Sequence, residues 1–137
     1  MAKVTLETER LRLREFKMSD FDAVHVYASD LEITQYMSFG PNSEAETKAF
    51  LQRTKSQRNV KRRTNYTLAI TLKETGQLIG GCSIFLNSGI NRDGEIGYVI
   101  NKDYHRQGYA PEASRAMIEF ALSELKLHRI YAFHHPD

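Results

Sequence analysis

The sequence predicts a mixed α/β fold in which helices flank a largely antiparallel central sheet. Residues 10–16, RLRLREF, alternate charged and apolar side chains, as a half-buried strand does. Two apolar runs, 65–72 and 77–86, are joined by a short segment whose Gly76 suits a tight turn, so they predict an antiparallel hairpin. Residues 111–125 repeat small and apolar side chains at helical spacing.

The remaining elements follow from local signals. Ser19 is expected to cap a first helix, and Ser43 with Glu46 forms a Ser-x-x-Glu capping box that predicts a second. Residues 95–100 and 129–135 are expected to be further strands. The predicted order is β-α-α-β-β-β-α-β, and 137 residues suit one domain that spans the whole chain.

Composition narrows the class of protein. The net charge of +2 tolerates an anionic ligand but falls short of a nucleic-acid-binding footprint. The single cysteine, Cys82, lies in an apolar stretch and is expected to be a small buried residue in a reducing compartment. The sequence shows neither a secretory signal nor an apolar run that would span a bilayer, so we expect a cytoplasmic protein without membrane contact.

The segment 101–110, NKDYHRQGYA, ends a strand and opens a helix. The first amides of a helix have no acceptor within it, and with the positive end of the helix dipole they form a natural anion site. Gly108 permits a positive φ or the close approach of a ligand, while Pro111 suits a first helical turn but has no N–H. The segment is neither a Walker loop nor a GxGxxG fingerprint. Glycine spacing alone leaves open a plain capped helix or a ligand-binding turn.

The wider segment 94–125 resembles the central motif of the GNAT superfamily of acyl-CoA N-acyltransferases. That motif is a strand, then Gln/Arg-x-x-Gly-x-Gly/Ala, then a helix. Gly108 and Ala110 fill the two small positions, and His105 stands where the family usually has Gln or Arg. The stretches LETERLRLREF and GYAPEA are similar to the RimJ/RimL-type branch, which contains ribosomal-protein N-terminal acetyltransferases. The resemblance runs from about Leu6 to the last residue.

The resemblance implies a site for acetyl-CoA as co-substrate and no metal. The backbone amides of the turn would hold the pyrophosphate, and the splayed strand before it would pair with the pantetheine arm. An amide on that strand can also polarise the thioester carbonyl. The residues implied are Tyr98, Val99, Ile100, Arg106, Gln107, Gly108, Tyr109, Ala110 and Pro111.

Direct attack on a thioester requires a neutral amine, so a general base is expected to help. Glu95 is the candidate because several family members carry a glutamate on this strand; the alternative is a carboxylate that faces solvent. Tyr98 is a candidate proton donor, although such tyrosines more often pack. In other family members the base lies on the following strand. This chain has Phe133 near that position, so a base is not expected there. His134 and His135 could substitute for the base, and they point to opposite faces, so a metal pair is not expected.

Two other charged features have simpler interpretations. Glu112, in the first helical turn, is expected to complement the helix dipole. The six cations of residues 53–63 are expected to be a solvated helix end. Guidance of CoA phosphates or of an acceptor carried on RNA is the alternative for those cations.

The predicted activity is transfer of an acetyl group from acetyl-CoA to a primary amine, with a protein N-terminal α-amine as one acceptor. The alternatives are a small-molecule amine (a polyamine, an aminoglycoside or an amino acid) or a catalytically silent CoA-binding domain. The charge balance disfavours an RNA-binding module.

The sequence ends in HHPD, where relatives continue with an asparagine, a short helix and two strands. We therefore expect a C-terminally shortened fold that lacks the last hairpin. A homodimer in which another copy supplies that hairpin is the alternative.

Overall fold

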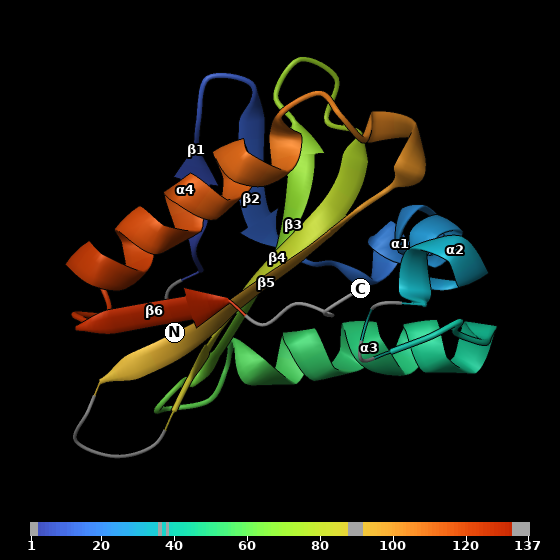
Figure 1. Cartoon of the computed structure of the whole chain (residues 1–137). Helices are drawn as coiled ribbons and strands as arrows, with labels where there is room; N and C mark the ends of the chain where they lie inside the picture. Colours follow the sequence, from blue (N-terminus) through green and yellow to red (C-terminus); the bar gives the residue numbers. More distant parts are fainter. Residues whose placement is uncertain (1–2, 36, 38, 88–91, 133–137) are drawn as a thin grey trace.

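The computed structural model describes residues 3–35, 37, 39–87 and 92–132, and it contains a six-stranded sheet in the order β1-β2-β3-β4-β5-β6 (Figure 1). Neighbouring strands are antiparallel except β5 and β6, which are parallel. The predicted mixed α/β fold with a largely antiparallel sheet is confirmed. The strands are β1 (Thr5–Glu7), β2 (Leu11–Glu15), β3 (Asn65–Leu72), β4 (Leu78–Leu86), β5 (Asp93–Ile100) and β6 (Arg129–Ala132).

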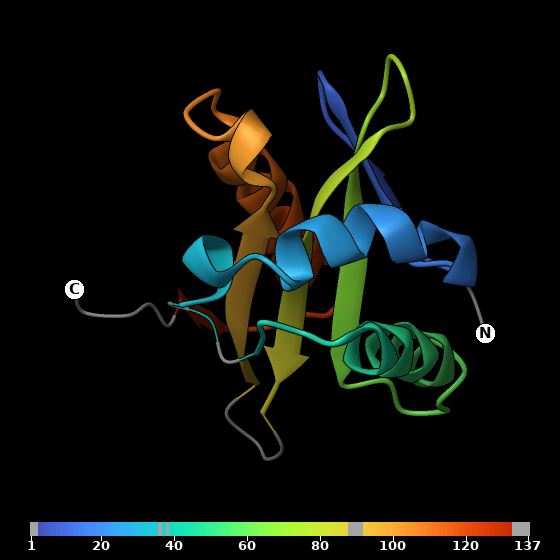
Figure 2. The same cartoon turned by 90° about the vertical axis from the view of Figure 1, so that its right-hand side faces the viewer.

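Helices cover both faces of the sheet, and each face has its own apolar core. Figure 2 shows α1 and α3 on the near side of the sheet and α4 behind it. Ala113, Met117 and Ala121 of α4 pack on one face, whereas Val24 and Leu51 belong to the core on the other. The helices are α1 (Phe21–Ala28), α2 (Leu31–Thr34), α3 (Glu44–Gln57) and α4 (Tyr109–Ser123), with 3-10 turns η1 (Met18–Asp20) and η2 (Lys102–Tyr104).

Local capping signals were only partly reliable. The Ser43–Glu46 capping box is confirmed, since each backbone amide donates to the other residue's side chain at 3.1 and 2.8 Å. The prediction that Ser19 caps the first helix is wrong, because a 3-10 turn precedes α1 and Asp20 stands at its N-cap position. The Asp20 side chain accepts instead from Lys17 N at 2.7 Å and from the Arg14 guanidinium. The position of Asp20 in the sequence does not indicate these partners.

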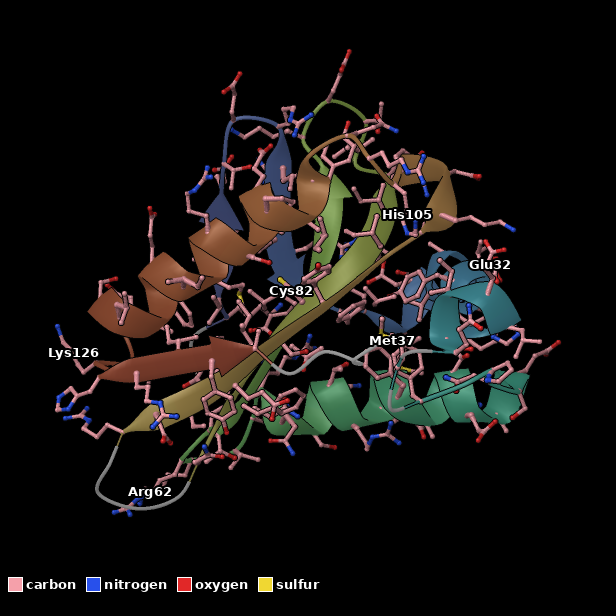
Figure 3. The ribbon with its side chains drawn as sticks, viewed as in Figure 1. Glu32, Met37, Arg62, Cys82, His105 and Lys126 are labelled. Carbon is pink, nitrogen blue, oxygen red and sulfur yellow. The ribbon has the colours of Figure 1, made fainter. Side chains whose placement is uncertain are left out.

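The interpretation of residues 53–63 as a solvated cationic segment is wrong for two of its members. Arg63 is buried and donates two hydrogen bonds to the buried Glu15 carboxylate, at 2.7 and 2.9 Å. Arg58 donates to the Phe16 carbonyl at 3.1 Å. Arg62 lies at the opposite end of the sheet from His105 (Figure 3), so the end of this segment is remote from the turn that precedes α4.

Cys82 lies in the middle of β4 and is 1% exposed. Burial raises the pKa of its thiol, so the side chain stays neutral and unreactive. The expectation of a small buried residue is confirmed. Among the helices of the described residues, none has both the length and the apolar character that crossing a bilayer requires.

Candidate functional site

The second half of β5 presents an edge that the described residues leave open. The parallel register between β5 and β6 runs from Asp93↔Arg129 to Ile96↔Ala132. On its other side β5 stays paired with β4 as far as Ile100. From Gly97 onward, no described residue pairs with β5 on the β6 side. This is the stretch that contains Tyr98, Val99 and Ile100.

Successive side chains of β5 point to opposite faces of the sheet. Ile100 belongs to the core beneath α4, and Val99 packs against the core on the α1 and α3 side. These two side chains are occupied by packing, so a ligand along the edge would meet mainly their backbone groups. Tyr98 shares the α4 face and is 52% exposed. Glu95 shares the face of Val99, so the structure does not bring Glu95 and Tyr98 together.

Glu95 is half-buried and lies close to the point where β6 pairing ends. Its cross-strand neighbours are Phe85 on β4 and Tyr131 on β6. The Tyr131 hydroxyl accepts a hydrogen bond from Asn87 Nδ2 at 2.8 Å, which holds the ring beside the strand. The candidates Phe133, His134 and His135 lie outside the described residues. Within the described ranges, no group of three His, Cys, Asp or Glu side chains gathers as a metal site would require.

The turn between β5 and α4 is held by hydrogen bonds that leave several amides unused. Asn101 Oδ1 accepts from Asp103 N at 2.9 Å, and His105 Nε2 lies 2.7 Å from the Ile100 carbonyl oxygen. The atypical His105 thus ties the turn to the end of β5. Gly108 has a φ of +83° at the N-cap of α4, so the positive φ expected of it is confirmed. The helix begins two residues before the predicted Pro111, because Tyr109 and Ala110 continue directly from the glycine.

Five consecutive backbone amides of this turn are available as donors. Among the described residues, no acceptor pairs with the N–H groups of residues 106–110, and the first amide beyond them, that of Glu112, donates to the Gly108 carbonyl at 3.2 Å. Arg106, with a φ of +64°, and Gly108 both depart from helical backbone, as in concave turns whose amides bind anions. Pro111 has no N–H and ends the row. Free amides at the positive end of a 15-residue helix suit a phosphate group.

Glu112 does more than complement the helix dipole. Its carboxylate accepts hydrogen bonds from the Thr8 hydroxyl and from Arg10 N at 2.9 Å, and it forms an ion pair with the Arg10 guanidinium at 2.7 Å. Sequence reasoning missed these two partners, since they precede Glu112 by about 100 residues. Partial burial opposes ionisation of Glu112, but the hydrogen bonds from Thr8 and Arg10 and the charge of Arg10 outweigh it and lower the pKa of this carboxyl.

The lowered pKa gives a prediction for stability against pH. A glutamate in an unfolded chain has a pKa of about 4.3, so the stabilisation by ionised Glu112 is fully present above that pH and is lost as pH falls through the lower folded-state value. We expect the wild type to melt at a higher temperature than Glu112→Gln at pH 7, and the difference to shrink in acid. Glu7, Glu9 and Glu119 line the same surface and are present in both proteins, so the difference isolates Glu112. A difference that stays constant down to pH 3 would contradict this assignment.

The part of β5 that the described residues leave unpaired, the amide-rich turn and the helix that follows characterise this α/β domain, and a helix start with such amides is suited to a phosphate group. The chain belongs to the acetyltransferase (GNAT) domain family, whose sequence pattern matches residues 10–137. It is therefore an acyltransferase of the N-acetyltransferase type, as its sequence predicts.

Similar proteins agree with this membership. The uncharacterised N-acetyltransferase YnaD of Bacillus subtilis is 34% identical over 132 residues, which are 96% of this chain and 74% of YnaD. The solved GNAT-family acetyltransferase from Bacillus anthracis matches with a TM-score of 0.81 and 31% identity, over 94% of this chain and 72% of that one. A solved structure described as a ribosomal-protein-serine acetyltransferase from Vibrio cholerae matches with a TM-score of 0.81 and 25% identity, over 98% of this chain and 75% of that one.

Proposed function

We propose that this protein transfers the acetyl group of acetyl-CoA to the N-terminal α-amine of a protein. The observation that carries the proposal is the row of amides of residues 106–110, which have no acceptor among the described residues and come directly after the stretch of β5 that these residues leave unpaired. A pyrophosphate accepts several hydrogen bonds at once, and the amides at the start of α4 offer them with the favourable end of the helix dipole. The backbone of Tyr98, Val99 and Ile100 would pair with the amide groups of the pantetheine arm.

Each part of the site has one task in this proposal. When bound, acetyl-CoA supplies a thioester, whose C–S bond breaks as the amine nitrogen bonds to the acetyl carbon. Glu95 takes the proton from the attacking amine through water, and an amide of β5 polarises the carbonyl. Tyr98, on the other face, is the candidate proton donor to the leaving thiolate. A base and an acid on opposite faces of one strand suit an amine and a thioester that meet at the open edge.

Protein N-termini are the favoured acceptors because of the likeness to the Vibrio cholerae structure, described as a ribosomal-protein-serine acetyltransferase. The same likeness favours the RimJ/RimL-type branch for this chain. An α-amine has a pKa near 8, so about a fifth of it is already neutral at pH 7.4 and a carboxylate base is adequate.

A direct assay tests the proposal. The protein is incubated with acetyl-CoA and short peptides that begin with serine or alanine, and released thiol and peptide mass are measured. The same peptides with blocked N-termini are the controls, and spermidine, kanamycin and free lysine are assayed in parallel. We expect acetylation of the free N-termini alone. Turnover only with the small amines would reassign the acceptor, and CoA binding without turnover would indicate a silent binding domain. Absence of CoA binding would overturn the proposal.

A further inference from the structure

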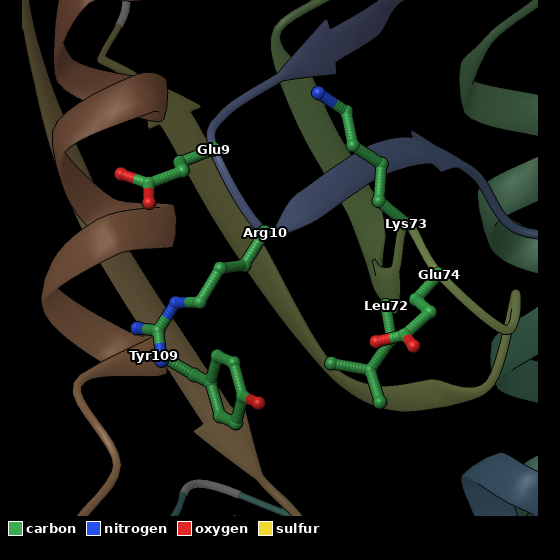
Figure 4. Close-up of a pocket in the computed structure, with 6 residues that line it drawn as sticks. All are labelled: Glu9, Arg10, Leu72, Lys73, Glu74 and Tyr109. Atoms are coloured by element: carbon green, nitrogen blue, oxygen red, sulfur yellow. The ribbon is translucent and has the colours of Figure 1, made fainter.

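Arg10 lies in the connection between β1 and β2, yet its side chain reaches the turn that opens α4. Its Nη1 donates to the Gln107 carbonyl at 3.0 Å, and its Nε and Nη2 each lie 2.7 Å from Glu112 Oε1. The guanidinium also lies over the Tyr109 ring (Figure 4), and its central carbon is 4.3 Å from the ring centroid. One side chain thus contacts three residues on both sides of Gly108.

We propose that Arg10 is a positioning residue for the ligand turn: it orients the Gln107–Gly108 peptide so that the Gly108 amide faces the pyrophosphate. This inference rests on the proposed function, because it assumes that the turn holds the diphosphate of CoA. Arg10 itself does not contact the ligand in this role.

The orientation follows from peptide geometry. The C=O and N–H of a trans peptide are fixed in one plane and point in opposite directions. Since Arg10 holds the Gln107 carbonyl on its own side, the N–H of Gly108 points away from Arg10. A glycine with a φ of +83° has no Cβ to restrict rotation of this peptide, so an external contact is needed to keep one orientation. The hydrogen bond from Arg10 supplies that contact.

The charges agree with a positioning role rather than direct phosphate binding. The guanidinium is paired with the Glu112 carboxylate at the protein surface, so a residue of the protein already balances its charge. The ring of Tyr109 covers its flat face. Glu112 is held in turn by the Thr8 hydroxyl and the Arg10 amide, which fixes the far end of the contact. Arg106 is exposed within the turn and has no ion pair among the described residues, so it can approach a ligand.

Lysine cannot replace arginine here. The guanidinium is a planar fork that donates in several fixed directions, and it uses them for Glu112 and Gln107 together while stacking on Tyr109. An ammonium group is a point donor without a face for stacking. We therefore expect Arg10→Lys to keep the ion pair and to lose the orientation of the peptide.

The test compares CoA with a ligand that lacks the diphosphate, which the turn would hold, and the nucleotide attached to it. Binding of CoA and of pantetheine, which lacks the diphosphate and the nucleotide, is measured for the wild type, Arg10→Gln and Arg10→Lys. We expect Arg10→Gln to weaken CoA binding about 10-fold, the effect of one charged hydrogen bond, and to leave pantetheine binding unchanged. Arg10→Lys should weaken CoA binding as much as Arg10→Gln does, because it also loses the orientation of the peptide.

The matched control is Arg12→Gln. Arg12 lies on the same hairpin, is about half exposed and pairs with Glu7 at 3.5 Å, so this variant removes an arginine without touching the turn. It should bind both ligands as the wild type does. Equal weakening of CoA and pantetheine by Arg10→Gln would show a merely structural role, and unchanged CoA binding would also overturn the inference. A wild type that binds no CoA would instead contradict the proposed function.

Discussion

Gly108→Val is expected to weaken acetyl-CoA binding by about 10- to 100-fold. A Cβ in the left-handed region costs about 1–2 kcal/mol, and a β-branched residue tolerates it least. The new Cβ would also lie 3.3 Å from Arg10 Nη2, so the added methyl groups would press on the contact that orients the turn. Each 1.4 kcal/mol needed to restore the binding conformation weakens affinity tenfold. Calorimetric titration with acetyl-CoA measures the effect.

Gly76→Val separates the loss of the site from the loss of stability. Gly76, in the β3–β4 turn, has a φ of +80°, and a Cβ there would meet nothing within 4 Å. This variant therefore has a similar backbone cost without a contact to the turn of α4. Both variants should melt at lower temperature than the wild type, and only Gly108→Val should lose acetyl-CoA affinity. If both lost affinity equally, the turn would have no special role in binding.

Glu95→Gln is expected to lower kcat by about 100-fold or more while acetyl-CoA affinity stays unchanged. Removal of a positioned general base typically costs a factor of about 10² to 10⁴. The amide has nearly the same shape as the carboxylate, and Glu95 faces the α1 and α3 side, away from the Ile100 side chain and the core under α4. Ligand binding at the turn should therefore survive. Thiol release with a serine-initiated peptide measures kcat.

The dependence of kcat on pH shows whether Glu95 acts as a general base. Above about pH 8 most of an α-amine is already neutral, so the defect of Glu95→Gln should become smaller as pH rises. Glu119→Gln, which alters an exposed carboxylate on α4, is the control and should behave as the wild type. If kcat of Glu95→Gln at pH 7 equalled that of the wild type, Glu95 would be a solvent-facing carboxylate without a role in catalysis.

Local sequence was sufficient for most of the elements and for the candidate turn. The alternation of residues 10–16, the hairpin around Gly76 and the apolar stripe of α4 each correspond to an element of the structure. Their signals depend on neighbours two to four positions apart, which is the range over which backbone geometry acts. The motif around Gly108 led to the family for the same reason, since a turn that needs a small residue with positive φ marks it in the sequence. The three-residue β1 and the four-residue α2 escaped because neither is long enough to show a period.

Tertiary structure alone decided which charged residues work together. No pattern in the sequence indicates that Arg10 pairs with Glu112, which lies 102 positions away. Nor does any pattern indicate that Arg63 is buried against Glu15, which lies 48 positions away. Tertiary structure also decided that Glu95 and Tyr98 lie on opposite faces of the sheet. In the described residues, it ended the pairing between β5 and β6 at Ile96. The physical reason is that an ion pair depends on distance in space and on burial, and neither leaves a periodic trace along the chain. Local patterns in the sequence were enough for most of the elements, the turn and the family, whereas the fold set how Arg10 and Glu112 hold that turn.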